Sequence, residues 1–173
     1  MKRFDEMTGE DILQLYRLLR TDPHRFLQLA EEYIQRYPEE PGGYDTRADA
    51  WDVLGHLDRA LEDFSTSLSR RPIAITFERR AQILRRLGRY QEAIDDLNRS
   101  EAMAPDNWGE TFAPLYRADC HACLGNEAAA LADCDRLPND HWTPGMHDTP
   151  AGNKEAVIKE IKRRARAART LPS

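Results

Sequence analysis

The hydrophobic positions of this chain recur with the period of an α-helix over most of its length. Between residues 74 and 105, two such runs stand on either side of Gly88. The first run holds Phe77, Ala81, Leu84 and Leu87, and the second holds Tyr90, Ala93, Ile94, Leu97 and Met103. Spacings of three and four place each run on one face of a helix. Gly88 tolerates the positive φ that commonly ends a helix, and Pro105 stops the second run, so the segment predicts a helical hairpin.

The same pattern returns 33 residues upstream and 37 residues downstream. The upstream copy has Gly55, Leu57, Ala60, Leu61, Phe64 and Pro72, and the downstream copy has Gly125, Ala130, Leu131 and Cys134. The four extra residues of the second spacing fall around 106–111. A helix-turn-helix unit that recurs about every 34 residues is typical of tetratricopeptide repeats. The chain resembles that family over about 41–137, with a weaker match at 8–38.

The pattern and the resemblance together predict an all-α fold, an α-α superhelix of about four hairpins with a C-terminal capping helix. We expect a single domain over 1–173. Its expected parts are a degenerate hairpin at 8–38, hairpins at 41–72, 74–105 and 111–137, a loop at 138–152 and the capping helix at 153–170. Strand signals are absent. Terminal repeats are expected to be atypical because they cover the exposed apolar ends of the stack.

Turn and cap residues set the expected element ends. Thr8 followed by Asp11 is a variant of the capping box, and Pro23 after Asp22 suits the first turn of a second helix. The Pro41-Gly42-Gly43 segment is expected to break the chain. Pro114 is unfavourable inside a helix, so either a helix capped by Thr111 begins near residue 112, or an earlier helix is kinked at the proline.

An arginine and an aspartate recur in every full hairpin, sixteen residues apart. The pairs are Arg47 with Asp63, Arg80 with Asp96 and Arg117 with Asp133. This spacing predicts that each arginine of a first helix reaches the aspartate of its own second helix and fixes the geometry of the hairpin. We interpret these pairs as structural.

The resemblance implies a concave groove lined by the first helices of successive hairpins. The matching positions are Asp45, Asp49, Asp52, Val53, Glu78, Gln82, Arg85, Arg86, Leu115, Asp119, Ala122 and Cys123. Such a surface suits a peptide or protein segment with a basic and an apolar portion, whereas the alternative is an ordinary solvated face. Trp142, in the loop, either packs over the third hairpin or contributes to the partner site. Function is thus expected to be that of an interaction adaptor or scaffold.

One known use of these repeats is a clamp of Lys, Asn and Arg side chains that grips a C-terminal carboxylate. The matching positions here hold Asp45, Asp49, Arg79, Phe112 and Tyr116. Because two of these carry the wrong charge and most have the wrong chemistry, we expect no carboxylate clamp. Whether the apolar end of the stack is used for self-association stays open.

Charge is divided unevenly along the chain. The net charge is -5, but the segment from Lys154 onward carries +5 and the preceding residues carry -10. The basic segment is either a solvated face of the capping helix or a contact for nucleic acid or another acidic partner. The second alternative would use Lys159, Lys162, Arg163, Arg166 and Arg169. The acidic body and the lack of interleaved aromatics disfavour nucleic acid.

Candidate chemistry is sparse. Cys120, Cys123 and Cys134, with His121, His141 and His147, could in principle hold zinc or act in redox chemistry. The repeat pattern instead places Cys120 and Cys134 in the core, where free cysteine is common. No phosphate-binding glycine loop or catalytic constellation stands out, so we expect a non-enzymatic protein without cofactor or metal. Three cysteines, the charged first ten residues and the absence of a long apolar run favour a cytoplasmic protein.

Overall fold

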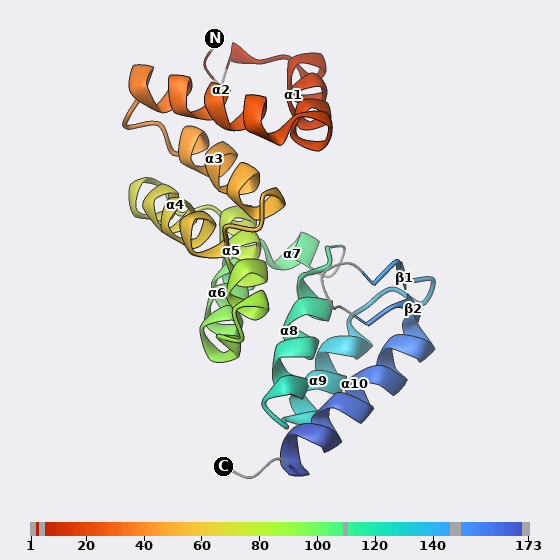
Figure 1. The fold of residues 1–173 in the computed structure, drawn as a ribbon. Coiled ribbons are helices and arrows are strands. Elements are labelled where there is room, and N and C mark those ends of the chain that lie inside the picture. The colour runs from red at the N-terminus through yellow and green to blue at the C-terminus, as the bar shows by residue number, and fades with distance from the viewer. Residues whose placement is uncertain (1–2, 4–5, 109–110, 146–149, 171–173) are drawn as a thin grey trace. The chain divides into compact units, whose positions relative to one another are not determined.

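The computed structural model is built from short antiparallel helices (Figure 1). It describes residues 3, 6–108, 111–145 and 150–170. The chain divides into two compact units, residues 1–83 and 84–173, which we call the N-terminal and C-terminal units. Each unit is described by itself. The assignment of the whole chain to a single domain stays a prediction.

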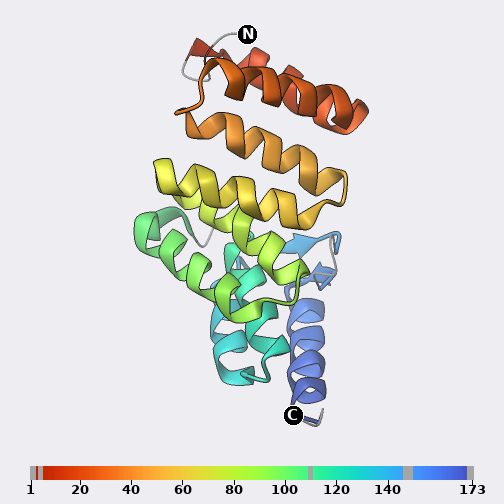
Figure 2. The same ribbon diagram turned by 60° about the vertical axis from the view of Figure 1, so that its left-hand side comes forward.

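The N-terminal unit contains two helical hairpins and the first part of a third. Its elements are α1 (Gly9–Thr21), α2 (Pro23–Arg36), α3 (Pro41–Val53), α4 (Leu57–Arg70) and residues 74–83 of α5 (Ala74–Arg86). Along the chain, α1 to α4 each lie beside the next helix, as the layered ribbons of Figure 2 show. The core buries Leu19, Phe26 and Ala50, from the first three of these helices.

The predicted caps of the first hairpin are confirmed. The Thr8 side chain accepts a hydrogen bond from the backbone N–H of Asp11, whose carboxylate in turn accepts from the Thr8 N–H at 2.8 Å. Asp22 caps α2, with Pro23 in the first turn. The expected apolar face of α1 is only partly buried, since Leu19 is 9% exposed but Ile12 and Tyr16 are each 40% exposed. Among the described residues, α1 packs mainly against α2 and α3.

The Pro41-Gly42-Gly43 segment does not break the chain, so that expectation is wrong. These residues form the first turn of α3, where Pro41 needs no hydrogen-bond donor. Gly43 is buried against α2. A Cβ atom at this position would stand 2.8 Å from Cδ1 of Tyr33 and 2.9 Å from Cγ1 of Ile34. The glycine is therefore required by the close approach of two helices.

The glycines between the helices of the three main hairpins behave as predicted. Gly55, Gly88 and Gly125 have φ angles of 79°, 74° and 76°. Each follows the last turn of a first helix, in the left-handed conformation that ends a helix without steric cost only at glycine. The repeat pattern thus predicts the exact glycine at which each of these turns occurs.

The C-terminal unit is organised around a core that three helices share. Its elements after residue 86 are α6 (Tyr90–Met103), α7 (Pro105–Trp108), α8 (Ala113–Cys123), α9 (Glu127–Asp135), β1 (Trp142–Thr143), β2 (Gly152–Asn153) and α10 (Lys154–Thr170). The last helix packs against both α8 and α9 (Figures 1 and 2). Its Val157, Ile161 and Ala165 are fully buried among residues of those two helices. The predicted capping helix is confirmed at these positions.

The four-residue insertion forms a short helix of its own. Residues 105–108 make α7, and α8 begins at Ala113, one residue later than expected, with Phe112 as its cap residue. Pro114 lies in the first turn of α8, so no kink arises. The side chain of Thr111 accepts a hydrogen bond from the Ala113 N–H at 3.1 Å. Met103, expected inside, is 49% exposed, whereas Trp108 is buried at 1% exposure.

The segment expected to be a plain loop contains two short strands. β1 and β2 pair antiparallel, with Trp142 opposite Asn153 and Thr143 opposite Gly152. The sequence predicts no strands, and this prediction is therefore wrong for these residues. Trp142 is 63% exposed, and both alternatives for its side chain stay predictions. His147 lies outside the described residues. No described helix is long and apolar enough to cross a membrane.

Candidate functional site

Three first helices of the N-terminal unit each contribute one residue to a linked cluster. Arg79, on α5, donates from Nη1 to Oδ2 of Asp49 on α3 at 3.0 Å. Its Nη2 donates to the hydroxyl oxygen of Tyr16 on α1 at 2.9 Å. We call the side of the unit that carries Tyr16, Asp45, Asp49, Asp52 and Arg79 the first-helix face. Arg79 joins α1, α3 and α5 across this face.

A second contact on the same face joins α3 to α5. The Thr76 hydroxyl donates to Oδ2 of Asp45 at 3.1 Å, and Thr76 itself is fully buried. The other carboxylate oxygen of Asp45, Oδ1, makes no hydrogen bond among the described residues. Burial raises the pKa of the Asp45 carboxyl, against the lowering effect of the nearby hydroxyls and arginines. Oδ1 is also buried, so this carboxylate oxygen is shielded from solvent.

Asp49 is the most strongly perturbed carboxyl of this face. Burial raises its pKa to about 6, although the Arg79 guanidinium acts in the opposite direction. Asp45 and Asp52 raise the pKa further because they are like charges. The side chain keeps 15% of its surface exposed. Its charge therefore changes near neutral pH, and an approaching cation would favour the ionised form.

This perturbation predicts a pH-dependent stability difference between the wild type and an Asp49→Asn variant. The pKa in the folded protein, about 6, lies above the ordinary value of 3.8. The protonated carboxyl therefore stabilises the fold below pH 3.8, and this contribution is lost as the pH rises through 6. Because the variant lacks the titration, the wild type should lose about 2 to 3 kcal/mol relative to it between pH 4 and 7.

Urea unfolding of both proteins, at closely spaced pH values in this range, measures that difference. A wild-type free energy of unfolding that rises relative to the variant with increasing pH would contradict the assignment. A constant difference would show that Asp49 titrates in the folded protein as it does in the unfolded chain.

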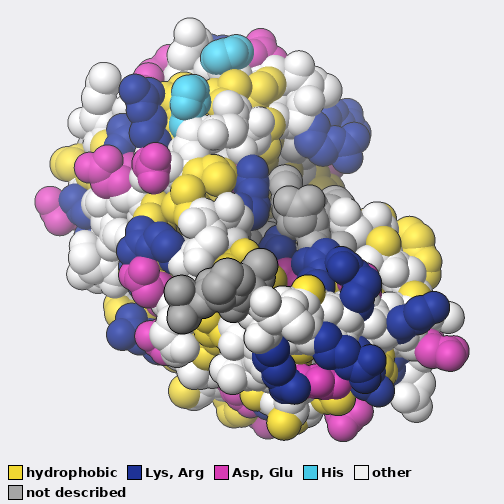
Figure 3. Space-filling model, turned by 60° about the horizontal axis from the view of Figure 1, so that its bottom comes forward, with side chains coloured by type: hydrophobic (Ala, Val, Ile, Leu, Met, Phe, Trp, Pro, Cys, Tyr) yellow, Lys and Arg dark blue, Asp and Glu magenta, His cyan; other side chains and the backbone are white. Residues whose placement is uncertain are grey.

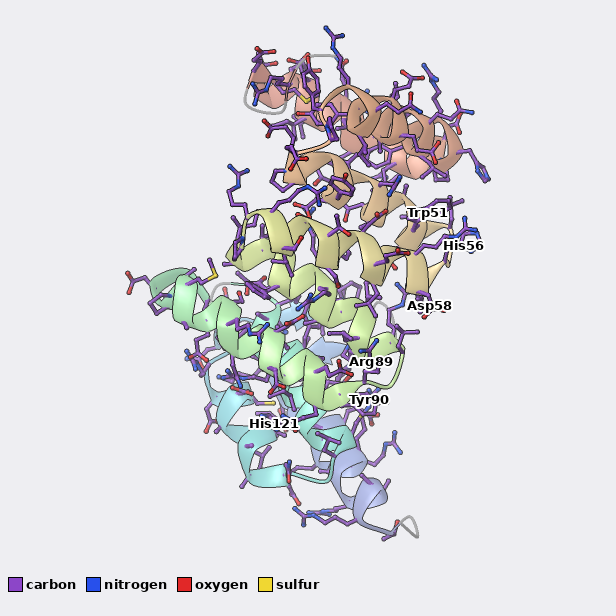
Figure 4. The ribbon with its side chains drawn as sticks, turned by 90° about the vertical axis from the view of Figure 1, so that its left-hand side faces the viewer. Trp51, His56, Asp58, Arg89, Tyr90 and His121 are labelled. Atoms are coloured by element: carbon purple, nitrogen blue, oxygen red, sulfur yellow. The ribbon has the colours of Figure 1, made fainter. Side chains whose placement is uncertain are left out.

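The remaining predicted groove residues of the N-terminal unit are less uniform. Asp52 and Gln82 are half-buried, and Glu78 is buried at 7% exposure. Trp51 lies in the last turn of α3, beside the turn that leads to α4, and Figure 4 shows it near His56. Its ring makes an edge contact with His56, with centroids 5.4 Å apart, and Arg59 lies 4.7 Å from its centroid. We therefore leave Trp51 out of the first-helix face.

The predicted groove residues of the C-terminal unit serve its own packing. Asp119, 1% exposed, accepts from Nη1 of Arg85 at 2.7 Å and from Nη1 of Arg164 at 2.6 Å. Leu115 and Ala122 are fully buried in the core that α10 completes. On α8, these positions, which the resemblance assigns to a partner, are therefore covered by the capping helix α10. Arg86 is half-buried.

Two of the three predicted arginine–aspartate pairs are confirmed. Arg47 binds Asp63 with two hydrogen bonds of 2.8 and 2.7 Å, and Arg117 binds Asp133 with two of 2.9 and 2.6 Å. Such two-point contacts fix the orientation of both side chains. The third pair, Arg80 with Asp96, joins residues of different units and stays a prediction.

The cysteines lie where the repeat pattern places them. Cys120 and Cys134 are fully buried, and burial raises the pKa of both thiols, that of Cys134 to about 12. Cys123 is half-buried beside Tyr90, which Figure 4 shows at the start of α6. Protonated thiols are poor nucleophiles and poor metal ligands. Among the described residues, no group of three or more His, Cys, Asp or Glu side chains could hold a metal ion.

Part of the chain is similar in sequence to a curated relative. No protein-family model matches the chain. It is 38% identical over 91 residues to the "Tetratricopeptide repeat protein 36 homolog" of Drosophila melanogaster. The match covers 51% of this chain and 49% of the relative, so the chain spans about half the length of that protein.

Solved structures match over most of the chain. A double mutant of MamA RS-1 has a TM-score of 0.68 at 17% identity. The match covers 90% of this chain and 86% of the MamA chain. TTC0263, a tetratricopeptide repeat protein of Thermus thermophilus, has a TM-score of 0.59 at 20% identity, with coverages of 91% and 80%. At these identities the likeness concerns the fold. The comparisons confirm the resemblance to tetratricopeptide repeat proteins and the expected all-α solenoid fold.

Proposed function

We propose that this chain, which has the tetratricopeptide-repeat fold, is a non-catalytic scaffold that binds a protein segment on the first-helix face of its N-terminal unit. The observation that carries the proposal is the concentration of three carboxylates on α3, one of which, Asp49, is linked through Arg79 on α5 to Tyr16 on α1. Carboxylates held in place by neighbouring helices bind a cationic side chain with little loss of conformational freedom. The partner is therefore expected to present Lys or Arg.

A hollow on α1 shares Tyr16 with the first-helix face. It is lined by Leu13, Tyr16, Arg17 and Arg20, together with Glu10 and Gln14. Leu13 is 68% exposed, so its side chain is available to a partner. Binding sites commonly combine an apolar anchor with flanking polar contacts. A segment with an apolar side chain a few residues from a basic one would fill both parts.

The proposal predicts which peptides the purified protein selects from a random displayed library. Selected sequences should combine Lys or Arg with Leu, Met or an aromatic residue. An Asp45→Asn, Asp52→Asn double variant should bind the selected peptide at least tenfold more weakly, because it loses two negative charges without a change of shape. Isothermal titration calorimetry measures the affinities.

The matched control is an Asp58→Asn, Glu62→Gln double variant. Both residues are exposed on α4, and their replacement removes the same charge. The control should bind as the wild type does. Equal weakening in both double variants would mean that net charge alone attracts the peptide, and this would contradict a site on the first-helix face.

A further inference from the structure

The exposed side of α10 carries a group of cations that no acid of the described structure neutralises. Lys159, Lys162 and Arg166 follow one another at spacings of three and four along the helix and line one shallow hollow, together with Ala156, Glu160 and Arg163. None of the three cations has an ion pair within the part of the chain that the structure describes. We call these three residues the basic stripe.

The other cations of α10 are already engaged. Arg163 binds Glu160 through two hydrogen bonds of 2.7 Å, and Arg164 binds both Glu160 and Asp119. Arg169 donates to the backbone oxygen of Gly125 at 2.8 Å. These contacts fix the helix on α8 and α9, so the basic stripe stands on a rigid support. Figure 3 shows Lys and Arg side chains, with acids between them, over the lower right of the view, where the C-terminal unit lies.

We propose that the basic stripe is a second binding surface, and that its ligand is an acidic protein segment. At 1.5 Å per residue, the distance from Lys159 to Arg166 along the helix is about 10 Å. That length matches two or three carboxylates on one face of a helix or along a short extended segment. The ligand differs in charge from the one proposed for the first-helix face, so the inference does not rest on that proposal.

Two other anionic ligands fit the observations less well. An amphipathic helix binds a membrane by inserting its apolar face, but Val157, Ile161 and Ala165 of α10 are fully buried in the protein. Nucleic acid favours a longer track of cations with aromatic side chains for stacking. The hollow contains no aromatic residue, and residues 84–153 of the same unit carry a net charge of -6, which repels a phosphate chain.

Fluorescence anisotropy tests the proposal with a labelled helical peptide that carries four Glu residues on one face. The full-length wild type should bind this peptide more weakly as salt rises, and should not bind the same peptide with Gln in place of Glu. A K159E, K162E, R166E triple variant should bind at least tenfold more weakly. Its buried residues are unchanged, so its circular dichroism spectrum and melting temperature should match those of the wild type.

The matched control is an R25E, R36E, R71E triple variant, which changes net charge equally at exposed positions of the N-terminal unit. It should bind the peptide as the wild type does. The proposal is overturned if the wild type does not bind the Glu peptide, or if both triple variants lose binding equally. Tighter binding of a labelled 20-nucleotide strand or of phosphatidylserine vesicles would also overturn it. So would salt-sensitive self-association, measured by sedimentation, that the first triple variant abolishes.

Discussion

Replacement of Trp108 by alanine should lower the free energy of unfolding by about 3 to 5 kcal/mol, the range found for large aromatic side chains removed from a core. Trp108 is 1% exposed, and two guanidinium groups contact its ring. Those of Arg117 and Arg136 stand 4.4 and 4.6 Å from its ring centroid. The alanine variant would lose the buried ring and both cation–π contacts at once.

The arginines around Trp108 also bind acids, which increases the expected loss. Arg117 donates to Glu101 at 2.5 Å and holds Asp133 of α9, and Arg136 pairs with the same Glu101. The tryptophan ring keeps both guanidinium groups in position for these contacts. Urea unfolding, followed by circular dichroism, measures the loss. Met103→Ala, at a position 49% exposed on α6, is the control and should cost less than about 1 kcal/mol. A Trp108→Ala cost as small as that of the control would contradict the packing role.

Replacement of Asp119 by alanine is the second change with a large expected effect. The carboxylate is the common acceptor of Arg85 on α5 and Arg164 on α10, and the side chain of Arg85 is only 4% exposed. Removal of one partner of a buried ion pair leaves the other charge buried without compensation. Such changes typically cost about 3 to 5 kcal/mol, which we expect here as well.

A double replacement separates two contributions to the free energy of unfolding: the cost of an unpaired buried charge and the net stabilisation by the ion pair. In an Asp119→Leu, Arg85→Met variant both buried charges are gone, while Arg164 keeps its contact with Glu160 at 2.9 Å. This variant should be more stable than Asp119→Ala by at least about 2 kcal/mol. If instead the double variant were the less stable of the two, the pair itself would contribute net stability. Thermal and urea unfolding of the three proteins decide between these results.

Features that repeat along the chain could be predicted, because each copy supports the interpretation of the others. Glycines at the three hairpin turns, the helical faces and the Arg47–Asp63 and Arg117–Asp133 contacts follow from spacings within one hairpin. These spacings are local, and the geometry of a helix converts them directly into positions in space.

Features that depend on contacts between different hairpins could not be predicted. The sequence around Gly43 indicates a chain break, since nothing in it shows that Tyr33 approaches the glycine. Trp108 lies in the insertion, where the repeat has no corresponding position. The repeat pattern assigns Asp119 to the groove, because the register of α10 on α8 depends on side-chain packing, which the period of the helix does not determine.

The sequence selects Asp45, Asp49 and Asp52 as partner-facing residues, and this stays a prediction. It does not indicate the link from Arg79 to Tyr16, because these residues are 63 positions apart and no spacing rule connects them. The raised pKa of Asp49 likewise depends on burial by neighbouring helices. The signal that could have found the link is the pairing of an arginine of α5 with acids on the preceding first helix.

The most direct test of the central claim, that the first-helix face of the N-terminal unit binds a protein segment, is a titration followed by nuclear magnetic resonance. The library-selected peptide is added to isotope-labelled protein, and the amide shifts of each residue are recorded. We predict the largest shifts at Tyr16, Asp45, Asp49, Asp52 and Arg79, with the side-chain resonances of Arg79 among them. Shifts confined to the second helices α2 and α4 would contradict the claim.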